Sequence, residues 1–161
     1  MLGDIYAFDV TLHGLPSAER EPPAAGGYED LGRSWPTLDV PRAWLSVPMD
    51  VGFDEALERL GRLERMYVEP DGSLVWTSPR EGRRWQVDGN AYERDGRVLL
   101  VDLKGSCPRP EFDHLIACFG WPAQRILVQL VRPALFLDEA TFRRHATARG
   151  LAGDGETLRP P

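Results

Sequence analysis

The alternation of hydrophobic and polar positions predicts both strands and helices in this chain. Residues 4–12 are rich in β-branched and aromatic side chains, which favours a strand. Residues 53–66 repeat apolar side chains at the spacing of a helix, with most charged side chains on the opposite side. Glu64 departs from this division, because it projects only about 40° from Leu60, inside the apolar arc. The pattern therefore aims one acid of this helix at the core.

Between residues 67 and 105 the pattern predicts a β-meander. The dipeptides Asp71-Gly72 and Asp95-Gly96 are typical of hairpin turns, and each lies between two segments of strand-like composition. The four strands predicted in this way cover Tyr67–Glu69, Ser73–Thr77, Arg84–Glu93 and Arg97–Gly105.

The rest of the chain predicts two more helices, one more long strand and an irregular segment. The helices cover about 110–119 and the residues from the cap Asp138 to about Arg149. The strand, Arg125–Val131, is almost continuously apolar, which is typical of the centre of a sheet. Prolines and glycines predict an irregular connection over 14–36, followed by a short strand at Ala43–Val47.

These elements predict an α+β protein with an α/β-type core. We expect a mostly antiparallel mixed sheet flanked by helices, in the order α-β-β-β-β-α-β-α. The core domain is expected to cover residues 51–149. Residues 1–50 are expected to form a strand and an irregular, Pro/Gly-rich segment packed on that core, and residues 150–161 a flexible tail.

Composition narrows the class of protein. The chain has 161 residues, the usual size of one domain, and its formal net charge of −6 disfavours a protein that coats nucleic acid through phosphate contacts. Two cysteines are too few for a disulfide framework. Neither a membrane span nor a secretory signal is apparent, so we expect a cytoplasmic protein with no membrane partner. Among 19 basic residues, Lys104 alone is a lysine, which indicates either a position that needs a compact ammonium or the chance survival of one surface lysine.

Lys104 belongs to the segment with the most informative chemistry. Asp102 and Lys104 share one face of their strand, because side chains alternate with period two. Whether Asp88 joins them depends on the turn between the two strands. A two-residue turn places Asp88 on the other face, whereas a three-residue turn over 94–96 places it opposite Asp102 and places Gln86 opposite Lys104. We expect the three-residue turn.

Two carboxylates that face each other across a strand pair repel, unless a cation lies between them. Mg²⁺ or Mn²⁺ suits such a site, because these ions take one or two carboxylates together with waters and phosphate oxygens. Asp88 and Asp102 are then the expected metal ligands, with Glu64 as a third acid from the preceding helix. Lys104, beside them, is placed to orient a water or to stabilise developing charge.

This arrangement resembles the PD-(D/E)XK superfamily of restriction-endonuclease-like nucleases. The similarity covers residues 53–131 and rests on Asp88 followed fourteen residues later by Asp102-Leu103-Lys104, with Val87 where the family motif has proline. The resemblance implies that Asp88 and Asp102 bind metal, that Lys104 is the catalytic lysine and that Glu64 is the helix acid. Nearby polar residues are the expected contacts to a nucleic-acid substrate: Arg80, Arg83, Arg84 and Gln86.

Three functions therefore remain open. The first is a metal-dependent phosphodiesterase or nuclease that acts on nucleic acid through a metal-activated water. The second is a non-catalytic α+β protein-interaction module, of the immunity or adaptor type, with a protein partner. The third is a ligand-binding sheet covered by helices on one side, with aromatic side chains lining a pocket. The five tryptophans are candidate anchors of the core or of an interface: Trp35, Trp44, Trp76, Trp85 and Trp121.

Overall fold

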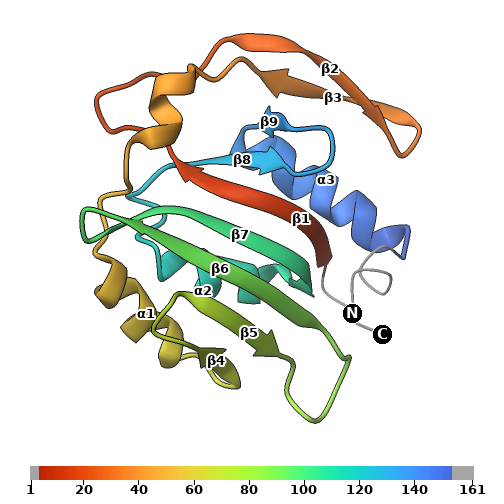
Figure 1. Ribbon diagram of the computed structural model, residues 1–161. Coiled ribbons are helices and arrows are strands. Elements are labelled where there is room, and N and C mark those ends of the chain that lie inside the picture. Colours follow the sequence, from red (N-terminus) through yellow and green to blue (C-terminus); the bar gives the residue numbers. More distant parts are fainter. Residues whose placement is uncertain (1–3, 154–161) are drawn as a thin grey trace.

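The computed structural model describes residues 4–153, which form one sheet of nine strands with three α-helices (Figure 1). Neighbouring strands are antiparallel, in the order β2-β3-β9-β8-β1-β7-β6-β5-β4. The α+β class is confirmed, and the sheet of the described residues is antiparallel rather than mixed. The strands are Ile5–Gly14 (β1), Ala24–Asp30 (β2), Arg33–Leu38 (β3), Met66–Val68 (β4), Ser73–Thr77 (β5), Gln86–Arg94 (β6), Arg97–Pro108 (β7), Ile126–Leu130 (β8) and Leu135–Leu137 (β9).

Strand β1 lies in the middle of the sheet, between β8 and β7. Its side chains alternate between an apolar face and a polar face, as the sequence of this strand predicts. Phe8 and Val10 are 1% exposed and belong to the hydrophobic core, whereas Asp9 and Thr11 point to the opposite face of the sheet. The first fifty residues therefore supply the centre of the sheet.

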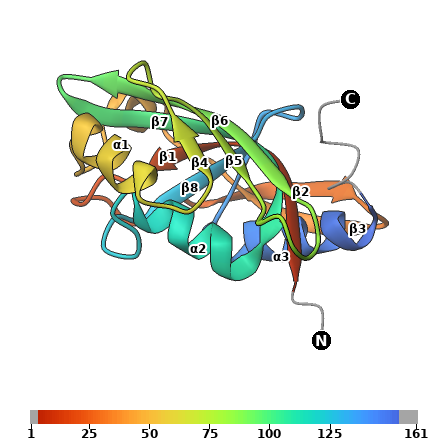
Figure 2. The same ribbon diagram turned by 90° about the horizontal axis from the view of Figure 1, so that it is seen from below.

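The helices lie on one side of the sheet and bury its apolar face (Figure 2). They are α1 (Phe53–Gly61), α2 (Arg109–Ala117) and α3 (Glu139–Leu151). Phe112 of α2 contacts Phe8 of β1 and Phe142 of α3, with ring centroids 5.5 and 5.4 Å apart. The side chain of Asp138 caps α3 by accepting a hydrogen bond from Thr141 N–H at 2.7 Å, which confirms its predicted role. No helix among the described residues has the length and hydropathy to cross a membrane.

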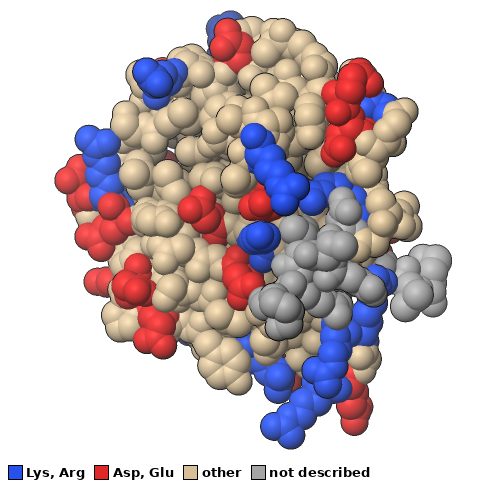
Figure 3. Space-filling model, turned by 45° about the vertical axis from the view of Figure 1, so that its right-hand side comes forward, with Lys and Arg blue, Asp and Glu red and all other residues tan. Residues whose placement is uncertain are grey.

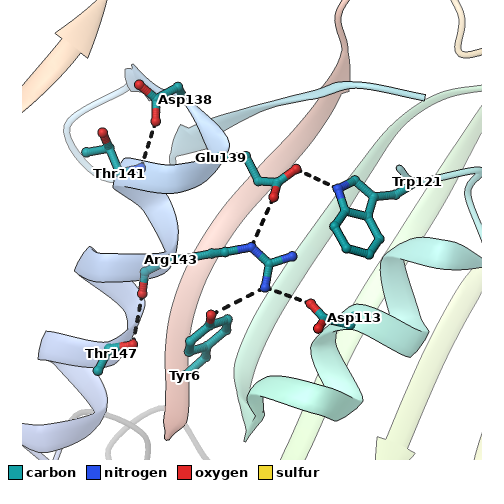
Figure 4. A network of polar contacts seen from close by, with 8 residues as sticks. All are labelled: Tyr6, Asp113, Trp121, Asp138, Glu139, Thr141, Arg143 and Thr147. Atoms are coloured by element: carbon teal, nitrogen blue, oxygen red, sulfur yellow. Dashed lines mark hydrogen bonds and ion pairs between the residues drawn. The ribbon is translucent and has the colours of Figure 1, made fainter. Parts of the chain in front are cut away.

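A network of hydrogen bonds and ion pairs joins α3 to α2 beside the hydrophobic core (Figure 4). The guanidinium of Arg143 donates to Asp113 Oδ1 at 2.6 Å, to Glu139 Oε2 at 3.1 Å and to Tyr6 Oη at 3.3 Å. Glu139 also accepts a hydrogen bond from Trp121 Nε1 at 2.6 Å. Because the Arg143 side chain is only 17% exposed, these charge-assisted contacts are shielded from water.

The prediction of an irregular connection over 14–36 is wrong for much of that segment, which forms most of the β2–β3 hairpin. Two consecutive residues with positive φ, Leu31 at 54° and Gly32 at 74°, make its tight turn. Trp35 on β3 is 1% exposed, and its ring meets that of His145 on α3 edge to face at 5.0 Å. The hairpin is therefore held by a contact more than a hundred residues away in sequence, which local composition does not reveal.

Two further local predictions are corrected. Ala43–Val47 is not a strand, because Arg42–Ser46 forms a short 3₁₀ helix, closed by the hydrogen bond from Val47 N–H to Trp44 C=O. The helix that begins at Phe53 ends at Gly61 rather than at residue 66. Glu64 consequently lies beyond the helix, exposed to solvent, and is not aimed at the core.

The register of β6 against β7 also differs from the expectation. Asp95 and Gly96, with φ of 53° and 77°, form a two-residue turn that pairs Arg94 with Arg97. A bulge follows, because Glu93 pairs with Val98 and Tyr92 pairs with Leu100, so that Leu99 is left without a partner.

This bulge decides which side chains share a face. Asp88 lies opposite Lys104 and Asn90 lies opposite Asp102, whereas Asp88 was expected opposite Asp102 and Gln86 opposite Lys104. A two-residue turn alone would have moved Asp88 to the other face, but the extra residue in β7 restores the alternation. The two acids are therefore diagonal neighbours on one face of the sheet.

Candidate functional site: the open face of the sheet

The face of the sheet opposite the helices, which we call the open face, is covered by none of the described helices. One row of residues crosses five of its strands, and each member pairs directly with the next. In spatial order from β4 through β5, β6 and β7 to β1, this row is Tyr67, Val75, Asp88, Lys104 and Asp9. Lys104 therefore has an aspartate directly opposite it on each side, and this arrangement offsets the repulsion between the acids.

A second row runs beside the first and is entirely polar from β5 to β8. It consists of Ser73, Asn90, Asp102, Thr11 and Gln129. Thr11 Oγ1 donates a hydrogen bond to Asp102 Oδ1 at 2.6 Å across the β1–β7 pair. Because strand residues two apart share a face, the two rows form one continuous polar surface.

Charge in the two central rows of this surface is unbalanced, whereas Arg132 and Arg149 line a hollow beside Asp9 and Lys104 at its β1 end. Asp9, Asp88 and Asp102 provide three carboxylates, and Lys104 provides one ammonium. None of the four groups forms an ion pair with a described residue. Asp88 instead accepts a hydrogen bond from the neutral amide of Gln86 at 3.0 Å. In Figure 3, which brings the right-hand end of Figure 1 forward, acidic and basic side chains lie next to one another near the centre of the view.

Exposed apolar side chains border the acids towards β4 and the β6–β7 turn. Tyr67 is 61% exposed, Tyr92 is 44% exposed and Val75 is 38% exposed. Tyr67 and Val75 lie directly across from each other, and Tyr92 shares the face of Asp88 on β6. Exposed tyrosines are enriched at surfaces that bind another protein.

His13 lies further along β1 on the same face and is almost completely buried, with 5% exposed. Its Nε2 lies 3.0 Å from Gln129 Oε1, and its ring contacts that of Phe136 at 5.6 Å. Burial lowers the pKa of His13, an effect that the hydrogen bond to Gln129 and the charge of Asp102 oppose. This end of the surface therefore contains a neutral imidazole.

The structure brings three of the predicted site residues together and leaves others apart. Asp88, Asp102 and Lys104 share the open face, and Gln86 lies beside Asp88. Glu64 does not join them, because it lines a hollow on the helix side of the sheet. Within residues 4–153, no group of three or more His, Cys, Asp or Glu side chains is arranged to hold a metal ion. The three-acid metal site is therefore not formed by these residues.

The predicted substrate-binding arginines lie in the exposed loop between β5 and β6. Arg83 lines the same hollow as Glu64, on the helix side of the sheet. Arg80 and Arg84 are exposed in the same loop. The acids and Arg83 thus belong to different surfaces.

Among the members of the open face that were not predicted as site residues are three on β1 and β8: Asp9, Thr11 and Gln129. A signal for two of them was available, because polar Asp9 and Thr11 alternate with apolar Phe8 and Val10 along β1. What the alternation does not give is the partner strand. The pairing of β1 with β7 joins residues about ninety positions apart, so only the folded sheet places Asp9 beside Lys104.

The fold and this surface define an α+β protein with a single antiparallel sheet, apolar under its helices and polar on its open face. Comparisons with protein-family models, with curated proteins and with solved structures find no match to the chain.

Proposed function

We propose that this protein is a non-catalytic interaction module. Its open face binds a basic surface of a protein partner. The observation that carries this proposal is the row from Tyr67 to Asp9, in which unpaired charges continue exposed apolar side chains across five strands. Such a module acts by occupying its partner's surface, as an immunity-type or adaptor-type protein does.

The charges of the open face indicate that its partner has a basic surface. The two central rows of the open face offer three carboxylates for one ammonium, and the whole chain has a net charge of −6. Arginine or lysine side chains of a partner complement Asp9, Asp88 and Asp102, and such complementarity accelerates association and selects against acidic proteins. Tyr67 and Tyr92 provide aromatic anchors at the edge of the same surface.

The experiment combines capture with matched variants. The immobilised parent protein is used to isolate basic binding proteins, and each isolated binder is then titrated calorimetrically with three purified variants. Asp88→Asn/Asp102→Asn and Tyr92→Ala change the open face, whereas Glu19→Gln/Glu58→Gln removes two exposed acids, one in the loop before β2 and one on α1. We expect the open-face variants to weaken binding at least roughly tenfold and the control to leave it unchanged. Equal binding by all three variants contradicts the proposal.

A second candidate function is favoured by one observation: Asp88, Asp102 and Lys104 share the open face on adjoining strands. This supports the resemblance to PD-(D/E)XK nucleases, in which Asp88 and Asp102 would hold Mg²⁺ or Mn²⁺. A cation there would supply an activated water for hydrolysis of a phosphodiester, next to the ammonium of Lys104. The separate location of Glu64 makes this candidate weaker than the interaction module.

Calorimetric titration with Mn²⁺ separates the two candidates. Binding by the parent that the Asp88→Ala/Asp102→Ala variant loses would support a metal site at these carboxylates. Nucleic-acid cleavage that depends on the metal and disappears in Lys104→Ala would then establish the phosphodiesterase. Absence of both effects, with binder capture intact, leaves the interaction module.

A further inference from the structure

The structure contains a hollow of about 500 Å³ on the helix side of the sheet, separate from the open face. It lies between the end of α1, the loop that joins β5 to β6, and α2, and we call it the tryptophan hollow. Trp76 and Trp85 contribute to its wall, with their rings edge to face at 5.0 Å. Neighbouring Val75 points to the open face instead, because side chains alternate along β5.

Rigid apolar groups form much of the hollow. Trp76 is 3% exposed, and its Nε1 donates a hydrogen bond to the backbone carbonyl of Glu64 at 2.9 Å. Pro79 and Pro108 line the hollow as well, and the hydrogen bond from Ser78 N–H to Trp85 C=O closes the base of the loop. Aromatic rings and prolines offer flat surfaces on which a planar group can stack.

Trp85 differs in its hydrogen bonding from three other tryptophans of the chain. The indole N–H groups of three tryptophans donate to protein acceptors: Trp35, Trp76 and Trp121. Trp85 is only 7% exposed, and its N–H makes no hydrogen bond to any described residue. Trp85 Nε1 is not among the buried polar atoms that lack a partner, so this donor is accessible to solvent. Because Trp85 lines the hollow, its N–H is available to an acceptor on a ligand.

The charged groups of the hollow favour a cationic ligand. Its lining includes Glu64 after α1, Glu81 in the β5–β6 loop and Glu111 on α2. Glu64 and Glu81 form no ion pair among the described residues, and Glu111 has only His114, at 3.6 Å. Arg83 is the one permanently charged cation of the lining. Three carboxylates from three separate elements therefore surround an aromatic wall.

We infer that the tryptophan hollow binds an arginine side chain presented by a peptide segment. The guanidinium is planar, stacks on aromatic and proline faces, and forms paired hydrogen bonds with carboxylates. The peptide carbonyl beside the arginine is the acceptor for the Trp85 N–H. The hollow falls within the usual size range of ligand sites and is large enough for the side chain and adjoining backbone.

The test uses acetyl-Gly-Arg-Gly-amide as the probe and the indole N–H resonance of Trp85 as the readout. Comparison with Trp85→Phe assigns that resonance in the NMR spectrum. We expect the resonance to shift saturably with the arginine peptide. The same peptide with neutral citrulline in place of arginine is expected to produce no saturable shift, because it lacks the charge that the carboxylates recognise.

Charge-removing variants provide the matched comparison. Glu64→Gln/Glu81→Gln preserves shape and is expected to weaken binding of the arginine peptide by roughly tenfold or more. Glu19→Gln/Glu29→Gln removes the same charge at exposed positions outside the hollow and is expected to leave binding unchanged. Equal binding of the arginine and citrulline peptides, equal loss in both double variants, or no saturable shift at millimolar peptide overturns the inference. Each result is independent of the open face, whose variants leave the hollow intact.

Discussion

The two faces of the sheet are built by the same strands and have opposite character. On β7, Val101 and Leu103 are at most 1% exposed and belong to the core, whereas Asp102 and Lys104 alternate with them on the open face. One face buries its side chains under three helices, and the other presents charges that no described side chain neutralises by an ion pair. We conclude from this difference that the side chains of the helix face provide most of the free energy of folding. The side chains of the open face are therefore available for binding.

The largest effect is expected from a substitution on the helix face. Phe112 is fully buried and contacts Tyr6, Phe8 and Phe142. Phe112→Ala is expected to lower the free energy of unfolding by about 3–5 kcal/mol, because it removes apolar burial and leaves a cavity. Urea denaturation measures this change. Tyr92→Ala, on the open face, is the control and is expected to change it by less than about 0.5 kcal/mol. Similar losses of unfolding free energy in both variants would contradict the conclusion that the helix face contributes more to stability than the open face.

A smaller loss is expected at the polar network that joins α2 to α3. Arg143→Met removes the hydrogen bonds to Asp113, Glu139 and Tyr6 and is expected to cost about 2 kcal/mol of unfolding free energy. The acids are one-third exposed, so water solvates them when the guanidinium is absent. A double-mutant cycle with Asp113→Asn measures the coupling. Additive effects of the two substitutions would show that this contact contributes nothing.

The buried His13 predicts a pH dependence of stability at one end of the open face. Because burial lowers its pKa in the folded protein, the unfolded chain takes up a proton first as the pH falls below about 6.5. The free energy of unfolding therefore falls on acidification until the pH passes the folded pKa. His13→Gln keeps a hydrogen-bonding side chain at this position and removes the titration. Urea denaturation at pH 7.5 and 5.5 compares the two proteins.

The other histidines and the carboxylates that face His13, such as Asp102, are present in both proteins. Their titration therefore largely cancels in the difference between parent and variant. An equal fall in stability for parent and His13→Gln would exclude His13 as the cause.

The smallest effect on stability is expected at the centre of the open face. Asp88→Asn/Asp102→Asn keeps acceptors for Gln86 and Thr11, so the free energy of unfolding is expected to change by less than about 0.5 kcal/mol. Thermal unfolding measures this change, and binding of a captured partner is measured on the same protein. A large loss of stability would mean that the two acids serve the fold, which would remove the contrast between the faces.

Local pattern was sufficient for much of the secondary structure. The β-branched and aromatic composition of 4–12 predicted β1, and the two Asp-Gly dipeptides predicted the turns of the meander. The helix cap at Asp138 was also predicted correctly, because its side chain satisfies a backbone N–H three residues ahead. These features depend on neighbours close in sequence, and such neighbours can be evaluated from the sequence itself.

Predictions failed where distant contacts override local preference. The β2 segment is rich in alanine and glycine and looks irregular, yet it pairs with β3, whose Trp35 is held against α3. The three-residue turn was preferred over 94–96, but a bulge at Leu99 restores the face of Asp88 by another route. Neither outcome is encoded in the turn residues alone, because pairing with several other strands sets the register.

The sequence by itself determined which residues of each strand are polar, and therefore that Asp102 and Lys104 share a face. Period-two alternation is a property of the backbone, so it needs no knowledge of neighbouring strands. Only the tertiary structure decided that β1 lies between β8 and β7, which brings Asp9 to Lys104 and Thr11 to Asp102. It also separated Glu64 from these acids, because Glu64 follows α1 on the helix side of the sheet whereas the acids point to the open face. The order of the strands, and the side of the sheet on which each loop lies, depend on burying the whole apolar surface at once. No local segment of the sequence contains that information.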